Sequence, residues 1–330
     1  LAAWALLPMG QVLTGLAAWP MVNVSLAQPP WLLALLALLG AAGLVLKLPW
    51  SWKLWCLPLL WPVLAWSPAR PAQGAFDVLA ADVGQGNAVL VRTATHSLLY
   101  DAGPRYAAES DAGHRVLVPL LAQMGEKIDV LVLSHRDSDH TGGAAAVLAM
   151  QPQAKLWTSL EDEHPLHALR PDWTRCWAGQ SWVWDGVHFE VLHPFAAQGA
   201  ETALPATPGF RGPSAAGKPR PNAVSCVLRI QSTQGSALLA GDIEAAQELD
   251  LVRRGLAPVD VLLVPHHGSK TSSSRAFLQA LQPQWAVVQA GYRNRFGHPA
   301  PEVLARYEDL QIPWVGSSHC GAATWRSDRP

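Results

Sequence analysis

The stretch "VLVLSHRDSDHTGG", residues 130–143, is the most informative in the chain. Its first four residues form a continuous apolar run, which is typical of a strand buried on both faces. Four potential metal ligands follow within six residues, namely His135, Asp137, Asp139 and His140. Imidazole and carboxylate groups suit a divalent cation, and alternate positions of an extended loop face the same side. The stretch therefore predicts a metal-binding loop. The competing interpretation is a polar loop in which Asp139 or Thr141 caps the next helix.

Two later segments end in the same kind of residue. "LLAGD" stops at Asp242, and "VLLVPHHGS" stops at His266 and His267. Taken alone, Asp242 would be read as a helix cap and the two histidines as a weak hint. In an α/β layer, however, the carboxyl ends of the strands gather at one edge and build the site. We therefore expect these groups to converge on a two-ion site bridged by Asp242. His266 is slightly favoured as the ligand because it ends the strand.

The pattern from residue 76 onward predicts the fold class. Short apolar strands alternate with helical segments, which indicates an α/β sandwich rather than an all-β fold. "WVWDGVHFEVLHP" predicts a hairpin that turns at Asp185-Gly186. Residues 196–221 are rich in Ala, Gly and Pro and predict a long loop.

The first part of the chain has a different composition. No charged residue or histidine occurs from Leu1 to Leu46, and eight of the sixteen tryptophans fall in the first 66 residues. Residues 31–46 and 54–66 are predicted to be membrane-embedded. The alternative is a soluble protein with buried helices. We expect membrane segments at 1–66, a linker at 67–75 and the metal domain at 76–330.

Charges in the leader predict an orientation. Lys47 and Lys53 lie between the two apolar segments, so this loop is expected on the cytoplasmic side and the metal domain on the periplasmic side. The chain begins with Leu, without a basic region before the apolar stretch, so we expect a fragment of a longer membrane protein rather than a signal peptide.

Two bulk properties restrict the possible functions. The net charge of −1 argues against a polybasic nucleic-acid binder. The four cysteines, at positions 56, 176, 226 and 320, show no C-x-x-C pairing. They therefore predict neither a zinc knuckle nor a disulfide framework.

Eight segments in order resemble one known family. "HRDSDHTGG" is similar to the first motif, H-x-H-x-D-H, of the metallo-β-lactamase fold. The closer resemblance is to the C-terminal domain of the ComEC family of bacterial DNA-internalisation proteins, through "ADVGQGNAVLV", "LLYDAG", "LSHRDSDHTGG", "VLHP", "NAVSCVLRI", "LLAGDIE", "PHHGSKTSSS" and "RFGHPAPEVL". It covers residues 76–320, and the uncharged leader resembles that family's last membrane segments. The resemblance implies an αββα sandwich preceded by transmembrane helices in the bacterial inner membrane.

The resemblance also implies ligands and partners. His135, Asp137, Asp139 and His140 match the first metal motif, Asp242 matches the bridging carboxylate, and His266 and His267 cover the last ligand position. The membrane part of the family passes single-stranded DNA inward, and the metal domain is thought to degrade the other strand. The expected partners are DNA in single- or double-stranded form, the membrane and other uptake components. The oxygen-rich ligand set favours manganese, with magnesium or zinc as alternatives.

Two positions depart from the family pattern. Asn87 replaces the last Asp of D-V-G-Q-G-D, and Asn222 stands where the wider fold usually has a His. An amide is a poorer metal ligand than a carboxylate or an imidazole. We therefore expect one ion to bind weakly, and we assign Asn222 to substrate binding.

Residues around the ligands predict supporting roles. Asp101, at a strand end, is expected to hold a ligand histidine through its second ring nitrogen. Asp139 and His298 are the candidate catalytic residues, with His298 donating to a leaving oxygen. Candidate phosphate contacts are Lys270, Thr271, Ser272, Arg293 and Arg295. Lysines and arginines on loops are more often simply solvated.

Three functions fit these observations. The first is a metal-dependent nuclease of DNA uptake that hydrolyses a phosphodiester with two ions. The second is a non-hydrolytic module of a DNA channel, to which Asn87 and Asn222 point. The third is a hydrolase of another phosphoester, because no basic run marks the domain.

Overall fold

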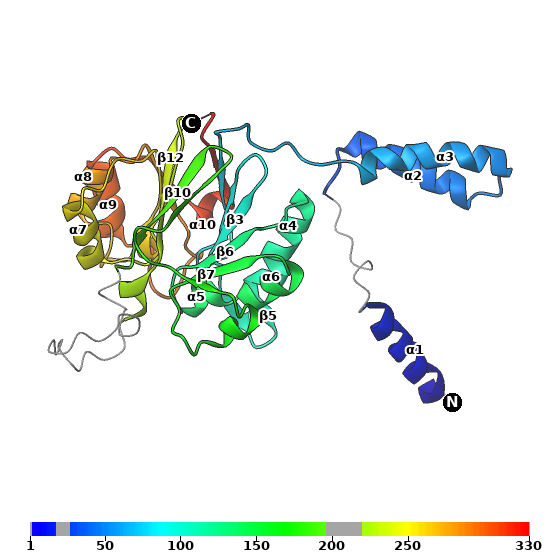
Figure 1. The fold of residues 1–330 in the computed structure, drawn as a ribbon, viewed down its shortest axis with the longest axis horizontal. Coiled ribbons are helices and arrows are strands. Elements are labelled where there is room, and N and C mark those ends of the chain that lie inside the picture. Colours follow the sequence, from blue (N-terminus) through cyan, green and yellow to red (C-terminus); the bar gives the residue numbers. More distant parts are fainter. Residues whose placement is uncertain (1, 18–26, 196–219, 330) are drawn as a thin grey trace. The chain divides into compact units, whose positions relative to one another are not determined.

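The computed structural model describes residues 2–17, 27–195 and 220–329, so most of the predicted loop at 196–221 lies outside the described residues. The chain divides into two compact units. The first holds the residues up to Ala69 together with Leu120–Glu126, and the second holds Arg70–Pro119 and the residues from Lys127 onward. Figure 1 shows the course of the chain through both.

The first unit is built from helices α1 (Ala2–Ala17), α2 (Trp31–Val45) and α3 (Trp50–Leu64). Prolines at positions 30 and 49 occupy the residue before α2 and α3, where no backbone N–H is needed. Gly40 lets the two helices approach closely, since a Cβ atom there would lie 2.8 Å from the carbonyl oxygen of Cys56. These two helices form a tight pair.

The membrane spans expected at residues 31–46 and 54–66 are not supported. Helices form in both places, but within the described ranges no helix is both long and apolar enough to cross a membrane. α2 and α3 contain 15 residues each, which is about 22 Å, whereas a hydrocarbon core is roughly 30 Å thick. Many of their apolar side chains are nevertheless exposed, including Trp31, Trp50 and Trp55.

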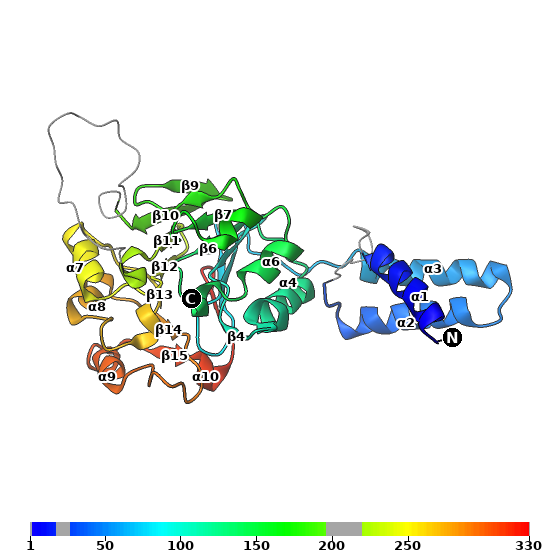
Figure 2. The same cartoon turned by 90° about the horizontal axis from the view of Figure 1, so that it is seen from below.

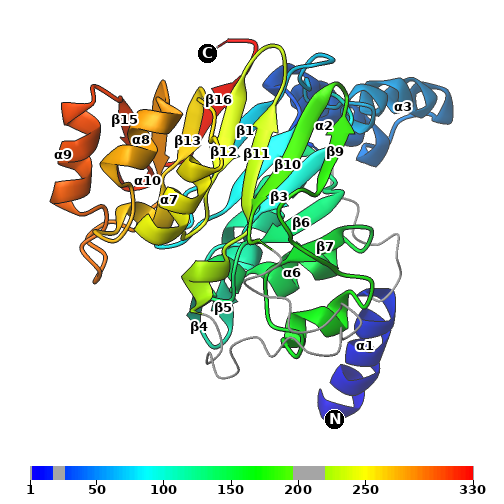
Figure 3. The same cartoon turned by 60° about the vertical axis from the view of Figure 1, so that its left-hand side comes forward.

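The second unit contains two seven-stranded sheets. The first sheet has the spatial order β16 (Ala323–Arg326), β1 (Asp77–Ala80), β2 (Val89–Arg92), β3 (Ser97–Tyr100), β6 (Val130–Leu133), β7 (Lys155–Thr158) and β8 (Thr174–Arg175). The second has the order β15 (Trp314–Gly316), β14 (Trp285–Val288), β13 (Val261–Leu263), β12 (Ser236–Leu239), β11 (Val227–Gln231), β10 (Val187–His193) and β9 (Ser181–Trp184). Figure 3 shows this second sheet as a fan of strands.

Helices cover the outer faces of both sheets. The helices of this part of the chain are α5 (Ser138–Thr141), α6 (Ala144–Met150), α7 (Ala245–Arg253), α8 (Arg275–Leu281), α9 (Pro301–Asp309) and α10 (Ser317–Cys320), whereas most of α4 (Val118–Met124) belongs to the first unit. In Figure 2, α7, α8 and α9 lie outside the second sheet and α6 outside the first. The layers are therefore helix, sheet, sheet, helix, as the αββα prediction requires.

Two apolar cores hold the layers together. Inward-facing side chains of both sheets form the first, with Phe76, Tyr100 and Phe189 fully buried. The second lies between the second sheet and its helices, and contains Phe277 and Tyr307. Burial of this many apolar side chains is the main stabilising contribution. The continuous apolar run at 130–133 is a strand buried along its whole length, as predicted.

Strand direction sets the place of the site. β3, β6 and β7 are parallel neighbours in the first sheet, and β12, β13 and β14 are parallel neighbours in the second. Their carboxyl ends therefore point to one end of the sandwich. The predicted hairpin joins β9 to β10, and its turn residues Asp185 and Gly186 have φ of 52° and 81°, the left-handed values of a two-residue turn.

Candidate metal centre

The polar residues that follow these parallel strands meet at one end of the sandwich. The Asp242 carboxylate, just beyond β12, lies at their centre. The Nε2 atom of His140 lies 3.1 Å from Asp242 Oδ1. The Nε2 atoms of His267, His266 and His135 lie 3.6, 3.8 and 3.9 Å from Asp242 Oδ2. The predicted convergence is thus present in the structure.

The other two carboxylates of the loop border the same cluster. Asp139 Oδ2 lies 3.2 Å from His267 Nε2, and Asp137 Oδ2 lies 3.5 Å from His135 Nε2. Two overlapping groups have their ligand atoms within 4.8 Å of one another: His135, His140 and Asp242, and Asp139, His140 and His267. Two overlapping groups of this kind can hold two ions side by side. The assignment of each residue as a ligand stays a prediction.

The helix-capping alternative for this loop is not supported. Asp137 precedes α5 but makes no side-chain cap hydrogen bond. The residue before α6 is Gly143, which has no side chain to cap with. Thr141 Oγ1 donates instead to the carbonyl oxygen of Asp137. The polar side chains of the loop face the cluster rather than the helix ends.

Hydrogen bonds on the far ring nitrogens aim the imidazoles. His140 Nδ1 donates to Asp101 Oδ2 at 2.7 Å, between two fully buried side chains. His267 Nδ1 donates to the carbonyl oxygen of Gln289 at 2.8 Å. His135 Nδ1 lies 3.0 Å from Ser134 Oγ, which itself donates to Asp101. Each Nε2 atom is therefore left facing the cluster, which is how proteins orient histidine ligands.

The preference for His266 over His267 is not supported by this geometry. Both residues adopt left-handed backbone angles, with φ of 53° and 54°, which non-glycine residues rarely adopt. This turn brings His267 to the buried centre, where only 2 % of its side chain is exposed, against 20 % for His266. His266 lies at the edge, with Nδ1 3.6 Å from Glu244.

Opposite charges in the cluster stabilise one another's ionised forms. Burial raises the pKa of Asp242, but the charges of His140 and His267 outweigh this and hold it well below its usual value. Burial likewise opposes ionisation of Asp139, yet the hydrogen bond from His267 and the charge of His140 lower its pKa to about 2. For His140, burial lowers the pKa, whereas Asp242 and Asp101 raise it well above its usual value.

The donor set fits a divalent cation. His135 Nε2 is buried and makes no hydrogen bond within the described part of the chain. Burying such an atom unpaired is unfavourable, and a bound cation would satisfy it. Both side-chain atoms of Asn87 are also buried without a hydrogen bond to the described residues. Its backbone N–H donates to the carbonyl oxygen of Asp139, which places Asn87 directly behind the motif.

The predicted substrate residues separate into two groups. His298 and Arg295 line a cleft of about 610 Å³ that opens over Asp139 and Asp242. Asn222 Nδ2 lies 3.4 Å from His266 Nε2, so it contacts a candidate ligand. Arg293 packs on the exposed ring of Tyr292. Lys270 forms an exposed ion pair with Glu302 at 3.0 Å and does not line the cleft.

His298 occupies the wall of the cleft beside the histidine pair. Its ring centroid lies 5.7 Å from that of His266 and 6.3 Å from that of His267. Burial and the charges of these two neighbours lower its pKa to about 4. At neutral pH the ring is therefore uncharged, and any donation to a leaving oxygen would use its single neutral N–H.

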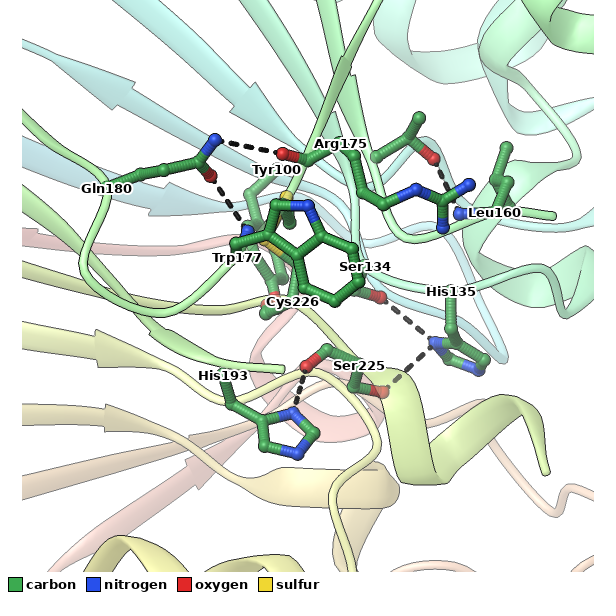
Figure 4. Close-up of a disulfide and its surroundings, with 12 residues drawn as sticks. Tyr100, Ser134, His135, Leu160, Arg175, Trp177, Gln180, His193, Ser225 and Cys226 are labelled. Atoms are coloured by element: carbon green, nitrogen blue, oxygen red, sulfur yellow. Dashed lines mark hydrogen bonds between the residues drawn. A yellow bond between two sulfur atoms is a disulfide. The ribbon is translucent and has the colours of Figure 1, made fainter. Parts of the chain in front are cut away.

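Sequence reasoning did not detect two features near the site. Cys176 and Cys226 form a disulfide across 50 residues, contrary to the expectation that the cysteines carry no disulfide information. Spacing rules do not detect it, because its halves belong to different sheets. Figure 4 shows Ser225, next to Cys226, lying against His135. The second feature is the aromatic residues at the mouth of the cleft, Tyr106 and Phe296.

A larger cavity, of about 720 Å³, opens between the sheets among β1, β13, β14 and β16. Its walls are mostly apolar, and of the metal-binding residue types only Cys320 lines it. The metal chemistry therefore belongs to the smaller cleft.

Comparison with known proteins identifies the family. Residues 81–291 match the metallo-beta-lactamase superfamily, which is more than half of the chain. The chain belongs to the metallo-β-lactamase superfamily. The fold and the order of the polar motifs agree with this membership, and the superfamily implies binding of a divalent metal at the cluster described above.

Within the superfamily, the chain is similar to competence proteins. It is 35% identical to competence protein ComA of Neisseria gonorrhoeae over 88% of this chain and 38% of that protein. It is 34% identical to recombination protein 2 of Haemophilus influenzae over 70% of this chain and 26% of that protein. For ComE operon protein 3 of Bacillus subtilis the identity is 31%, over 78% of this chain and 34% of the relative. The resemblance to competence proteins is confirmed, although the chain spans well under half of each relative.

Proposed function

We propose that the second unit is a metal-dependent phosphodiesterase that cleaves DNA as part of a bacterial DNA-uptake machinery. The observation that carries the proposal is the position of Asp242, whose two carboxylate oxygens face four imidazole nitrogens at 3.1–3.9 Å. A shared central carboxylate suits a two-ion hydrolase. The competence relatives support DNA as the substrate.

The residues of the site would have the following roles in holding the metals and the substrate. His135 and Asp137 would hold one ion, Asp139, His140 and His267 the other, and Asp242 both. Two bound divalent cations supply an activated water and stabilise the charged oxygens of an in-line displacement. Asp101 fixes His140, and Arg295 places positive charge at the cleft. The many carboxylate oxygens favour manganese over zinc, with magnesium as a further candidate.

We further propose where the metal domain lies and which DNA strand it degrades. The uncharged leader and the exposed apolar side chains of α2 and α3 support a place at the inner membrane. Lys47 and Lys53 support a periplasmic metal domain. A domain on that side would meet the strand that does not enter, and degrade it. A reporter fused after Pro330 that is active only in the cytoplasm would reverse this orientation.

The test is a cleavage assay with the purified chain. Labelled single- and double-stranded DNA and a simple aryl phosphodiester are each incubated with manganese, magnesium or zinc. Cleavage of DNA that a chelator stops, and that Asp242→Ala lacks, is the expected result. Cleavage of the aryl ester alone favours another phosphoester. Cleavage of neither contradicts the enzyme, and a non-hydrolytic channel module would then fit better, with Asn87 as the first position to examine.

A further inference from the structure

Exposed aromatic side chains gather at the mouth of the metal cleft. Among the described residues of the second unit, the aromatic side chains with large exposure are Tyr106, Trp285, Tyr292 and Phe296, at 42, 42, 69 and 52 %. Tyr106 and Phe296 line the cleft itself. Tyr292 belongs to the same loop as Phe296, which follows β14. Solvent-exposed aromatic rings concentrated at one site indicate a binding surface.

An arginine guanidinium group lies over each of three rings, those of Tyr106, Tyr292 and Phe296. The Cζ atom of Arg115 lies 5.6 Å from the ring centroid of Tyr106, that of Arg293 5.3 Å from Tyr292, and that of Arg295 4.8 Å from Phe296. The arginine side chains are exposed, and no ion pair within the described ranges uses Arg115 or Arg295. A base that replaces the guanidinium group on the ring would leave this positive charge close to its own phosphate.

The two cleft rings are held in place. The hydroxyl of Tyr106 donates to the carbonyl oxygen of Val83 at 2.9 Å, which fixes the ring on β4 (Arg105–Ala107). The backbone N–H groups of Phe296 and His298 donate to Asn294 Oδ1 at 3.1 and 3.0 Å. These bonds organise the loop that carries Phe296. A fixed ring loses little conformational freedom on binding, so it is suited to stacking.

The Phe296 side continues inward to the metal cluster. Its ring stacks on His298 at 5.7 Å with an interplanar angle of 22°, and His298 stacks in turn on His267 at 6.3 Å and 23°. A base on Phe296 would therefore be next to the candidate ligands. Tyr106 reaches the same cleft from β4, which comes after β3 of the first sheet, whereas the Phe296 loop comes after β14 of the second.

We propose that Tyr106 and Phe296, with Arg115 and Arg295, form a clamp that selects single-stranded DNA by stacking on unpaired bases. This deepens the proposed function and rests on it. Bases inside a duplex already stack on one another and leave no face for the clamp. Selection by stacking tolerates any base sequence, as a degradative enzyme requires.

Binding of a labelled strand tests the clamp directly. The probe is a fluorescein-labelled single strand of about 12 nucleotides, compared with the same sequence as a blunt duplex, with calcium replacing the active metal so that nothing is cut. Tyr106→Ala and Phe296→Ala should each weaken binding of the single strand by about ten- to a hundredfold. Duplex binding should change by less than about threefold.

Five further variants separate stacking from other causes of weaker binding. Phe296→Tyr and Tyr106→Phe keep a stacking ring and should bind close to wild type, whereas Phe296→Leu keeps only apolar bulk and should not. Trp285→Ala removes an equally exposed ring that lies outside the cleft, and should leave binding unchanged. Arg295→Gln should lower the salt dependence of single-strand binding by about 0.7 in the log–log slope.

The outcomes separate the clamp from the enzyme. Unchanged single-strand binding by both alanine variants, or equal loss on single strand and duplex, would overturn the clamp. Manganese-dependent cleavage by wild type could still be intact, so the proposed function would survive. Selective binding by a wild type that cleaves no DNA would instead remove the nuclease and leave the clamp.

The disulfide carries a second and independent inference. Cys176 follows β8 at the edge of the first sheet and Cys226 precedes β11 of the second, and both are fully buried. Cys226 lies next to the site, since its N–H donates to the carbonyl oxygen of Ser134 at 2.8 Å and its carbonyl oxygen accepts from Tyr100. Ser225 Oγ in turn lies 3.4 Å from His135 Nδ1 and accepts from the N–H of Asp242. Figure 4 shows Tyr100, Ser134, His135, Ser225 and Cys226 together.

We infer that the disulfide positions the Ser225 segment under the metal cluster, and that the second unit matures in an oxidising compartment. Two thiols lose two protons and two electrons when the bond forms, and these reduce the disulfide of a thiol-oxidising partner to two thiols. Such bonds are rare in the reducing cytosol. This agrees with the outer-side location without using the lysine argument.

Thiol alkylation before and after reduction tests the compartment. In protein denatured directly from cells, Cys176 and Cys226 should react only after reduction, whereas Cys56 and Cys320, which are free, should react before it. The variant with both residues changed to Ala should melt about 10 °C lower. It should also bind manganese more weakly at a temperature where it is folded. Alkylation of Cys176 and Cys226 without reduction overturns the bond, and unchanged manganese affinity overturns the positioning role.

Discussion

The two sides of the metal cluster are built differently. The inner side, His135, His140, Asp242 and His267, is buried, and each of its imidazoles has its far nitrogen hydrogen-bonded. The outer side, Asp137, His266 and His298, is partly exposed, with 45 % of the Asp137 side chain and 20 % of the His266 side chain accessible. We therefore expect the inner side to hold the metals firmly, while the outer side completes the ligand set through Asp137 and faces the substrate.

Removing the central carboxylate should have the largest effect. Asp242→Ala should reduce manganese-dependent DNA cleavage to background and lower the bound metal, because the carboxylate that faces all four imidazoles is lost. Activity is measured with labelled DNA, and metal content by elemental analysis. A folded variant that keeps its metal would show that Asp242 is not the bridge.

The second-largest effect is expected at Asp101, which supports the inner side. Asp101→Asn should lower metal affinity by about 10- to 100-fold, since the carboxylate that orients His140 loses its charge. Asn is the right substitution because Asp101 has φ of 59°, a conformation that Asn tolerates and Ala does not. Metal titration followed by calorimetry gives the affinity. An unchanged affinity would mean that burial alone orients His140.

The inner side also predicts a pH dependence. The pKa of His140 is raised by Asp242 and Asp101, so its contribution to stability is fully present below about pH 6.5 and is lost as pH rises through the raised value. Metal binding must displace that proton, so affinity should rise with pH, by up to about tenfold per unit for each proton released. Melting curves with and without manganese between about pH 6 and 9 should therefore show opposite slopes. Parallel slopes would contradict the coupling.

Changes on the outer side should be milder. His266→Ala should reduce cleavage by only several-fold, because His266 lies at the rim against Asn222 and Glu244. His267→Ala is the matched comparison, and should lose metal as the inner-side variants do. The pair is compared by metal titration and by turnover at saturating metal. Equal losses would place His266 among the ligands.

The smallest effect is expected at Lys270. It forms an exposed ion pair with Glu302 outside the cleft, and such pairs contribute little. Lys270→Ala should change DNA binding by less than about twofold. A fall of about one unit in the log–log salt dependence of DNA binding would instead show that Lys270 contacts a phosphate.

Much of the site was determined by the sequence alone. His135, Asp137, Asp139 and His140 are close together in the chain, so their proximity follows from the covalent backbone. Asp242 and the histidine pair could be added because parallel strands end at the same edge of a sheet. The eight family motifs fixed the fold class for the same reason, since each marks the end of a strand or the start of a helix.

Other features were decided only by the tertiary structure. The choice of His267 depends on a left-handed turn that makes neighbouring residues face different surroundings. Cys176 and Cys226 meet because the edge of one sheet packs on the other, across 50 residues. Tyr106 and Phe296 belong to loops far apart in sequence, and neither has a local pattern that distinguishes it from an ordinary surface ring. Local motifs encode which groups can bind a metal, whereas packing of the two sheets decides which of them face it and what surrounds the substrate.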